Sequence, residues 1–480
     1  MTDASALDRR LGTAAIRRTK LVCTIGPTSR RRVAELVTAG MDVARLNFSH
    51  GAPASRVAGA DAVRAAVAQV GRPVAILADL AGPKIRLGAL AGGEATLEAG
   101  RPFRLGGSAG EGSARGAGVS YRRLAADVRP GDRILLADGA AELRVTTVGE
   151  AVETEVVLGG VIRSHQGVSI PSDRLSTPPL TTRDRRDIPR VLELGADFVA
   201  QSFVRQASDV QVLRALLGPD GPPIVAKIET RSAIDDFDAI LEVVDAVMIA
   251  RGDMGVELPY EAVPIIQKQL IRRALDRGVP SIVATQMLES MIASPRPTRA
   301  EASDVANAVF DGADAIMLSG ETAIGAYPVL AAEAAVRVIR LCEERGAAHL
   351  SPGATVPAGG DAGALAFAAV TLARAADGIS AIACFTRSGR TARMLAALRP
   401  RVPIFAYSPD PSVIAELTLV HGVVARTCVS PPDTPARLGL MAWLLREAAV
   451  LPPGAAVVLV ASTAEPGTGP NLLEIHRLPG

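Results

Sequence analysis

Eight short apolar runs, alternating with longer segments of helical periodicity, constrain the fold of this chain more than any other feature. The runs are rich in valine, isoleucine and alanine, and their shortness is typical of fully buried parallel strands. They are Leu21–Ile25, Val43–Asn47, Val74–Asp79, Phe198–Gln201, Ile224–Lys227, Ala246–Ala250, Ser281–Thr285 and Ala315–Leu318. Eight strand–helix units predict an α/β fold built on a parallel (β/α)8 TIM barrel.

Three glycines placed before predicted strands indicate the same repeated unit. Gly40, Gly195 and Gly312 each stand two residues before an aspartate, at the end of a helical segment. Glycine readily adopts the left-handed conformation that closes a helix. The recurrence therefore predicts similar helix ends around the barrel.

The stretch between the third and fourth predicted strands has a different character. Glycine and proline become frequent there, and Arg133–Leu136, Leu143–Val148 and Glu153–Leu158 are rich in β-type residues. This pattern predicts a small β-rich domain inserted into the barrel. Because the insertion leaves and re-enters between barrel strands, we expect it to act as a lid over the barrel mouth.

A second alternating α/β region follows Arg345, after a linker rich in proline and glycine. Its predicted strands are Ala381–Phe385, Pro403–Ala406 and Ala456–Ala461. The predicted organisation is a tail at 1–18, a barrel domain formed by 19–88 and 178–345, a β-rich lid at 89–177, a linker at 346–362 and an α/β C-terminal domain at 363–480.

Bulk properties exclude several classes of partner and location. A net charge of +2 and an aromatic content of 3% provide neither the basic field nor the stacking surface of a nucleic-acid-binding protein. No apolar run approaches the ~20 residues of a membrane helix, and the N-terminal residues lack the apolar core of a signal peptide. The four cysteines form no zinc-binding spacing, so we expect free thiols and a cytoplasmic protein.

Polar residues follow seven of the eight predicted barrel strands. In a (β/α)8 barrel, catalytic groups lie at the C-terminal ends of the strands. The residues at these strand ends are Arg45, Asn47, Ser49 and His50; Asp79, Lys84 and Arg86; Ser202 and Phe203; Lys227 and Glu229; Arg251, Gly252 and Asp253; Thr285 and Gln286; and Ser319, Gly320 and Glu321. One such carboxylate is usually a surface group, but the repetition predicts a single polar site at the barrel mouth.

The residue types at this rim favour magnesium and phosphate chemistry. Glu229 and Asp253 offer only oxygen ligands, which suits a hard cation such as Mg²⁺, with Mn²⁺ as an alternative, and disfavours zinc. Arg45, Arg86 and Lys227 around that metal would form a pocket for a polyanion.

Lysine is rare in this chain. It occurs at four positions among 52 lysine and arginine residues. Lys227 and Lys84 therefore fit sites where a compact point charge is needed that a planar guanidinium cannot imitate. Compositional drift would also leave a few lysines anywhere, so both interpretations stay open on composition alone.

A polar turn in the C-terminal region indicates a second anion site. Thr386, Ser388, Gly389, Arg390 and Thr391 follow a predicted strand and open a helix, whose N-terminus attracts anions. A phosphorylated effector is one interpretation of this turn, and an ordinary strand-to-helix connection is the other.

Several motifs resemble those of the pyruvate kinase family and together span nearly the whole chain. They are LVCTIGP, MDVARLNFSHG, ARGDMGVELP, ATQMLESM, PRPTRAEASDVANAVFDGADAIMLSGETAIGAYP and SGRTAR. The resemblance implies a (β/α)8 domain split by a β-rich domain, an α/β domain after it, and a homotetramer. It also implies phosphoryl transfer from phosphoenolpyruvate to ADP, giving pyruvate and ATP in the last step of glycolysis, with a sugar phosphate or AMP as the effector.

The same motifs imply individual roles. Lys227 would stabilise the transferring phosphoryl group, and Arg45 would bind the substrate phosphate. The other assignments are Glu229 and Asp253 for Mg²⁺; Gly252, Asp253, Ser202 and Thr285 for the substrate, with Thr285 also at the site of enolpyruvate protonation; and Arg86, Asn47 and His50 for the nucleotide. Gln166 stands where many relatives have a lysine, which predicts weaker contacts from the lid to ADP.

The chain departs from the potassium-activated members of the family after its third strand. Those members have Thr, Lys and Glu at the positions of Leu80, Ala81 and Lys84. The matching monovalent-cation ligands here are Asn47, Ser49 and Asp79. Because an ammonium at Lys84 would supply the charge that potassium otherwise provides, we predict catalysis without a K⁺ requirement.

Two other functions remain on the sequence alone. A lyase acting on pyruvate or phosphoenolpyruvate would share the Mg²⁺ site, but it would need neither Lys227 nor a lid around a nucleotide. A sensor that binds a phosphorylated metabolite through Thr386–Thr391 would not need the intact set of polar groups at the barrel mouth. ADP-dependent ATP formation separates these functions.

Overall fold

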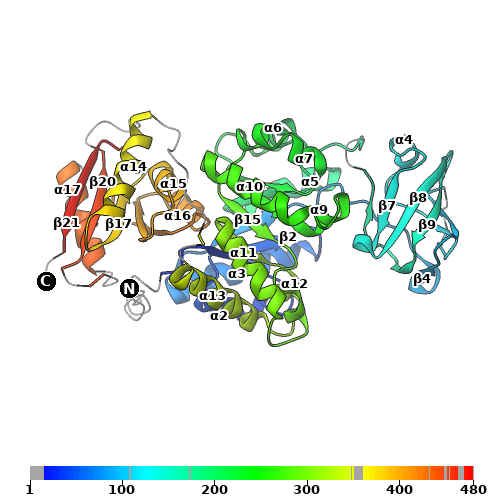
Figure 1. The fold of residues 1–480 in the computed structure, drawn as a ribbon, viewed down its shortest axis with the longest axis horizontal. Coiled ribbons are helices and arrows are strands. Elements are labelled where there is room, and N and C mark those ends of the chain that lie inside the picture. The colour runs from blue at the N-terminus through cyan, green and yellow to red at the C-terminus, as the bar shows by residue number, and fades with distance from the viewer. Residues whose placement is uncertain are drawn as a thin grey trace.

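The computed structural model describes residues 16–107, 110–171, 175–346, 349–350, 360–431, 433–447, 451–452, 454–462 and 470–478. The predicted tail (1–18) and linker (346–362) lie largely outside these residues. The molecule is elongated, with the barrel in the middle, the β-rich insertion at one end and the C-terminal domain at the other (Figure 1). None of the helices among the described residues is both long and apolar enough to cross a membrane.

The central unit is a closed barrel of eight parallel strands, as predicted. Each of the eight predicted barrel strands matches an observed one to within one residue at each end. The strands are β1 (Lys20–Thr24), β2 (Val43–Asn47), β3 (Ala75–Asp79), β12 (Phe198–Gln201), β13 (Ile224–Ile228), β14 (Ala246–Ala250), β15 (Ser281–Ala284) and β16 (Ala315–Leu318).

Helices surround the barrel and bury its outer face. The longer ones are α2 (Val33–Ala39), α3 (Pro53–Val70), α5 (Thr182–Glu193), α6 (Ala207–Leu217), α10 (Val263–Arg277), α11 (Arg299–Asp311) and α13 (Pro328–Arg345), with the short α7 (Arg231–Asp235), α8 (Phe237–Leu241), α9 (Arg251–Glu257) and α12 (Gly320–Ala323) between them. Gly40, Gly195 and Gly312 have φ values of 117°, 60° and 95°. The predicted left-handed helix ends are therefore present.

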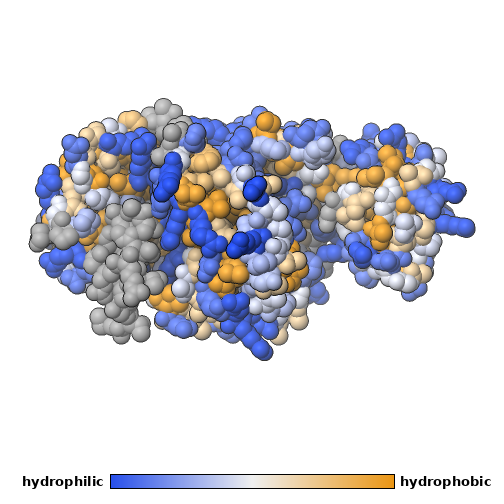
Figure 2. Space-filling model, turned by 60° about the horizontal axis from the view of Figure 1, so that its bottom comes forward, coloured by the Kyte–Doolittle hydropathy of each residue, from blue (hydrophilic) through white to orange (hydrophobic). Residues whose placement is uncertain are grey.

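The insertion forms a β-rich domain with its own core. Its strands are β4 (Glu94–Leu97), β5 (Pro102–Leu105), β6 (Gly116–Ala117), β7 (Arg133–Leu136), β8 (Ala141–Val148), β9 (Val152–Leu158), β10 (Gly160–Arg163) and β11 (Val168–Ser169), with one short helix, α4 (Leu124–Asp127). Phe103, Ile134 and Leu143 are fully buried in it. Figure 2 shows this domain as a separate lobe joined through a narrow waist, with hydrophobic residues in small patches among hydrophilic ones on the face shown.

The C-terminal domain is a five-stranded sheet in the order β19-β18-β17-β20-β21. Its strands are β17 (Ile379–Phe385), β18 (Ile404–Ser408), β19 (Val423–Thr427), β20 (Ala456–Ala461) and β21 (Leu472–Arg477). Helices α14 (Gly360–Ala375), α15 (Arg390–Ala397) and α16 (Pro411–Leu417) pack on one face, and α17 (Thr434–Glu447) packs on the other. The sequence analysis did not predict β19 or β21, because both are edge strands with partly exposed polar residues.

The C-terminal domain closes the N-terminal end of the barrel. Leu419, in the loop after α16, belongs to the cluster of buried side chains that fills the barrel interior and includes Val22 and Met248. The ammonium of Lys20 donates a hydrogen bond to the carbonyl oxygen of Val423, 2.6 Å away. Arg399 also pairs with Asp314 at 3.0 Å, and the amide of His421 donates to the same carboxylate. Apolar packing, hydrogen bonds and an ion pair therefore join these two domains.

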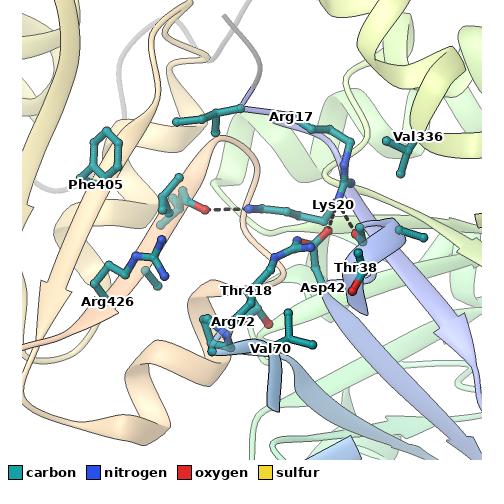
Figure 3. Close-up of a pocket in the computed structure, with 18 of the residues that line it drawn as sticks. Arg17, Lys20, Thr38, Asp42, Val70, Arg72, Val336, Phe405, Thr418 and Arg426 are labelled. Atoms are coloured by element: carbon teal, nitrogen blue, oxygen red, sulfur yellow. Dashed lines mark hydrogen bonds and ion pairs between the residues drawn. The ribbon is translucent and has the colours of Figure 1, made fainter. Parts of the chain in front are cut away.

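A cavity of about 170 Å³ lies beside this contact and is lined by both domains (Figure 3). Asp42 forms ion pairs with Arg17 and Arg72 at its barrel side. Burial, partly offset by the Asp42 charge, lowers the pKa of Lys20 to about 8. Arg17, Lys20 and Arg72 are thus tied to groups of the protein at the end of the barrel opposite the predicted active site.

Candidate active site

The strand register places the predicted polar residues in one layer at the C-terminal mouth of the barrel. Thr24 pairs with Arg45 across β1 and β2, and Asp79 pairs with Asn47 across β2 and β3. Each inward-pointing polar residue stands two positions after a buried apolar one, because side chains alternate along a strand. These pairs are Val22 and Thr24, Val43 and Arg45, Leu77 and Asp79, Ala200 and Ser202, and Val225 and Lys227.

Asp79 is the buried anion that holds the cations of this layer. Its Oδ2 accepts from Arg45 Nε at 2.7 Å and lies 2.6 Å from Arg45 Nη2, and its Oδ1 lies 3.6 Å from Lys227 Nζ. Burial opposes the negative charge, but Lys227 and Arg45 outweigh it and hold the pKa of Asp79 below its usual value. Arg45 also donates to the Thr24 hydroxyl at 3.0 Å, so its guanidinium has a fixed direction.

Lys227 is held by three neighbours. Its Nζ donates to Ser202 Oγ at 2.7 Å and forms an ion pair with Glu229 Oε1 at 2.8 Å, in addition to the contact with Asp79. Ser202 Oγ in turn donates to the carbonyl oxygen of Leu80 at 2.8 Å. Burial opposes the charge on Lys227, but Asp79 and Glu229 outweigh it and raise its pKa. The ammonium is therefore charged and oriented at neutral pH.

Glu229 and Asp253 are the carboxylates that fit a metal ion. Glu229 is buried, and its Oε2 accepts from the backbone amide of Phe203 at 2.7 Å. Burial, together with the Asp253 charge, raises the pKa of Glu229 to about 7 despite the nearby Lys227. Among the described residues there is no group of three or more histidine, cysteine and acidic side chains that could hold a metal. Two carboxylates without such a cage suit Mg²⁺, which takes its remaining ligands from water and substrate oxygens.

Thr285 follows β15 in a left-handed backbone conformation, with a φ of 71°. Its hydroxyl accepts from the amide of Gly252 at 2.8 Å and donates to the carbonyl oxygen of Ala284 at 2.6 Å. A Cβ added at Gly252 would lie 3.3 Å from that hydroxyl oxygen. The structure thus brings together the Thr285 hydroxyl and the Gly252 amide that the sequence assigned to one substrate site.

The predicted nucleotide residues lie where the lid joins the barrel. Arg86 bridges to Gly167 and donates to the carbonyl oxygen of His165 at 3.0 Å. Asn47 Nδ2 and His50 Nδ1 are 3.4 Å apart, and partial burial, together with the charge of Arg86, lowers the pKa of His50. These contacts place Arg86 at the connection between the barrel and the β-rich domain.

Gln166 forms a contact within its own turn. Its Oε1 accepts from the backbone amide of Arg163 at 2.6 Å. In this conformation the side chain stabilises the turn that carries β10 into the lid-to-barrel connection.

The residues predicted at the monovalent-cation position are partly dispersed. Asn47 Oδ1 accepts from the amide of Ser49 at 2.9 Å, and Leu80 is buried. Lys84 Nζ lies 3.4 Å from Asp253 Oδ1, a contact with a predicted magnesium ligand that the sequence did not reveal. The cavity beside them is lined by both barrel and lid, including Lys84, Asp253 and Ser169.

The turn formed by Thr386, Ser388, Gly389, Arg390 and Thr391 lies in the C-terminal domain, at the start of α15. Gly389 adopts a φ of 72° as the N-cap. Arg393 on the same helix donates to the carbonyl oxygen of Ser388 at 2.8 Å and pairs with Glu416 at 3.2 Å. The turn therefore lies in a different domain from the barrel mouth.

Two groups at the barrel mouth escaped the sequence analysis. Thr24 orients Arg45, and the backbone amide of Phe203 orients Glu229. Thr24 was detectable in principle, since it stands at an inward position next to the end of the first strand. The Phe203 amide was not, because its direction depends on a left-handed residue with φ of 57°.

Comparisons with known proteins agree along the whole chain. A family model described as pyruvate kinase, barrel domain, matches residues 16–332, and one described as pyruvate kinase, alpha/beta domain, matches residues 363–476. A pyruvate kinase from Mycobacterium tuberculosis is 43% identical over 469 residues, which cover 96% of this chain and 98% of the relative. One from Corynebacterium efficiens is 41% identical over 468 residues, with the same coverage of 96% and 98%. The crystal structure of a pyruvate kinase from Cryptosporidium parvum superposes with a TM-score of 0.87 at 32% identity, covering 100% of this chain and 98% of that chain.

Proposed function

The chain belongs to the pyruvate kinase family, and on that premise we propose how its own residues transfer the phosphoryl group of phosphoenolpyruvate to ADP. The observation that carries the proposal is the Lys227 ammonium, fixed at the barrel mouth by Ser202 at 2.7 Å and Glu229 at 2.8 Å. A positioned cation of this kind stabilises the charge on a transferring phosphoryl group, and catalysis of phosphoryl transfer consists mostly of such positioning and neutralisation.

Arg45 completes the cationic side of the site. Asp79 and Thr24 fix its guanidinium, so it presents its remaining donors to the substrate phosphate without reorganising. Guanidinium groups bind phosphate oxygens through paired donors, which orients the substrate as well as attracting it.

Glu229 and Asp253 would hold Mg²⁺, with Mn²⁺ as the alternative. When bound, the metal supplies positive charge to phosphoryl and substrate oxygens. Glu229 is already oriented by the Phe203 amide at 2.7 Å. The Lys84 ammonium lies 3.4 Å from Asp253 Oδ1 and partly neutralises the charge of that carboxylate.

Thr285 and Gly252 serve the pyruvate end of the substrate. The Gly252 amide, at the start of α9, donates to the Thr285 hydroxyl in this structure and would exchange that hydrogen bond for one to the substrate carboxylate when the substrate binds. The Thr285 hydroxyl stands at the position where enolpyruvate is protonated. Arg86, with Asn47 and His50, binds the phosphates and ribose of the nucleotide beneath the lid.

Catalysis without potassium is part of the same proposal. Asn47, Ser49 and Asp79 retain the ligand types of a monovalent-cation site, while Leu80 and Lys84 replace the other members of that site. The Lys84 ammonium supplies a permanent positive charge near Asp253, so K⁺ has no charge left to provide.

We also propose a homotetrameric, cytoplasmic enzyme regulated from its C-terminal domain. The turn formed by Thr386, Ser388, Gly389, Arg390 and Thr391 would bind a sugar phosphate or AMP, since it offers hydroxyls, amides and a cation at a helix start.

A coupled assay tests the function. It follows ATP synthesis from phosphoenolpyruvate and ADP with and without Mg²⁺, and with a panel of sugar phosphates and AMP. ATP formation that requires all three components supports the proposal. Turnover of phosphoenolpyruvate or pyruvate without ADP would instead indicate a lyase, and binding of a metabolite without any turnover would indicate a sensor.

A further inference from the structure

We propose that Arg251 is a positioning residue for the proton-transfer half of the reaction. Its guanidinium holds the turn at Thr285 and Gln286 in the conformation that keeps the Thr285 hydroxyl in hydrogen-bond contact with the Gly252 amide at the barrel mouth. This inference rests on the proposed role of Thr285 and extends it to a residue outside the reacting groups.

The turn after β15 has an unusual backbone. Thr285 and Gln286 have φ values of 71° and 54°. Left-handed conformations are strained for residues other than glycine, and most of all for a β-branched residue such as threonine. Such a conformation persists only where the surrounding structure supports it.

Arg251 supplies that support. Its Nη2 donates to the carbonyl oxygens of Thr285 at 2.6 Å and Gln286 at 3.3 Å. Its Nη1 lies 2.7 Å from Asp304 on α11. The Arg251 side chain is 11% exposed and that of Asp304 is 33% exposed, so the arginine end of these contacts is largely shielded from water. One guanidinium thereby ties together the start of α9, the turn after β15 and helix α11.

The geometry requires arginine. One terminal nitrogen of the guanidinium, Nη2, donates to both carbonyls while the other, Nη1, pairs with the carboxylate, whereas a lysine ammonium has only one nitrogen to serve all three acceptors. Asp304 sets the rotation of the fork. Arg251 thus binds the backbone of Thr285. The next residue of α9, Gly252, donates its amide to the Thr285 hydroxyl at 2.8 Å.

The affected step is a proton transfer to carbon. Enolpyruvate C3 takes a proton, the C2=C3 electron pair forms the new C–H bond, and the C2 oxygen becomes a carbonyl. In reverse, a proton leaves the pyruvate methyl group and a solvent deuteron replaces it. Arg251 carries no proton in either direction, and it acts by fixing the Thr285 hydroxyl.

The test measures exchange of the pyruvate methyl protons in D₂O by NMR, with Mg²⁺ and inorganic phosphate. Arg251→Gln should lower the exchange rate by about 10–100-fold, since a misplacement of about 1 Å has effects of this size. The KM for ADP should stay unchanged. Arg251→Lys and Asp304→Asn should have intermediate effects, because each keeps part of the fork.

Coupling between residues distinguishes positioning from a general structural role. Thr285→Val removes the hydroxyl and should itself lower the exchange rate. Arg251→Gln added to Thr285→Val should lower it little further, because coupled residues are non-additive. Arg214→Gln is the matched control, since Arg214 also pairs with an aspartate, Asp245, and with a backbone carbonyl, but on the outer helix α6.

Several results would overturn the inference. One is an exchange rate in Arg251→Gln no lower than in Arg214→Gln, and another is full additivity with Thr285→Val. If Arg251→Gln does not fold, Asp304→Asn decides by the same criteria. Normal exchange in Thr285→Val would remove the role of Thr285 and this inference together, whereas failure of the wild-type protein to make ATP would contradict the proposed function itself.

Discussion

At the scale of single residues, the four lysines of this arginine-rich chain occupy distinct environments. Lys227 and Lys84 lie in the candidate active site, as their rarity suggested. Lys20 is buried where the barrel meets the C-terminal domain. Lys268 pairs with Asp311 on the surface between α10 and α11, a contact that an arginine would also make. The rarity of lysine pointed to Lys227 and Lys84 alone, and the structure adds the environments of Lys20 and Lys268.

Replacing Lys227 by methionine should abolish most of the activity. We expect Lys227→Met to lower kcat at least ~10³-fold, because the variant loses transition-state charge stabilisation. Steady-state kinetics measures kcat, and thermal unfolding shows whether the fold survives the loss of a cation between Asp79 and Glu229. Lys268→Met is the control, and near-wild-type turnover in Lys227→Met would contradict the assigned role.

Lys20 predicts a pH dependence of stability. Its pKa is lowered from 10.5 to about 8 in the folded protein, so between these values the unfolded chain binds more protons. Stability should therefore rise with pH across this window. The difference in the free energy of unfolding between wild type and Lys20→Met should increase by about 3 kcal/mol from pH 7 to pH 10.5. A difference that stays constant with pH would show that Lys20 is not buried as a charge.

At the scale of elements, alternation along the barrel strands explains where the site lies. On β1, β2, β3, β12 and β13 the inward positions near the N-terminal ends are apolar and fill the barrel, and the next inward positions are polar. On β14, β15 and β16 both inward positions are apolar, as at Ala246 and Met248. The apolar layer excludes water from below, which strengthens the ion pairs of Asp79, Glu229 and Lys227 above it. The same strands therefore contribute the side chains of the barrel core and position the polar residues of the candidate site.

The loop after α16 acts as a plug at the other end of the barrel. Leu419 is 2% exposed and lies among the barrel-interior side chains. Leu419→Ala should lower the free energy of unfolding by about 2–5 kcal/mol, because it leaves a cavity between two domains. Denaturant titration measures the change. Leu341→Ala, at a leucine that is 56% exposed, is the control, and an equal effect of both substitutions would show that Leu419 does not seal the barrel.

At the scale of the whole molecule, the balance of charges in the active site predicts whether catalysis requires K⁺. Three cations, Arg45, Lys84 and Lys227, face three carboxylates at the barrel mouth. A protein that already carries the cation at Lys84 should not need another. The expected steady-state rate is therefore nearly the same when K⁺ is replaced by a bulky organic cation, and a drop of tenfold or more would contradict this. Lys84→Glu should introduce a K⁺ requirement, because it restores the residue type of potassium-activated relatives.

The sequence by itself predicted the barrel, the inserted β-rich domain and the α/β domain after it, whereas the chemistry of the site is our proposal. Short apolar runs such as Ala246–Ala250, repeated eight times between helical segments, predict parallel strands, and parallel strands place the residues that follow them, such as Arg45, Lys227 and Asp253, at one rim. Local pattern and topology were sufficient there, because both are set by residues close in sequence.

Only the tertiary structure decided how the groups are held. Three contacts join segments far apart in the chain. They are the ion pair of Lys84 with Asp253, the packing of Leu419 inside the barrel, and the hydrogen bonds from Arg251 to the Thr285 turn. Edge strands β19 and β21 depend likewise on neighbours that cover one face. Such contacts arise from packing, which a linear pattern does not encode, because a side chain's partner is set by where its whole element comes to lie.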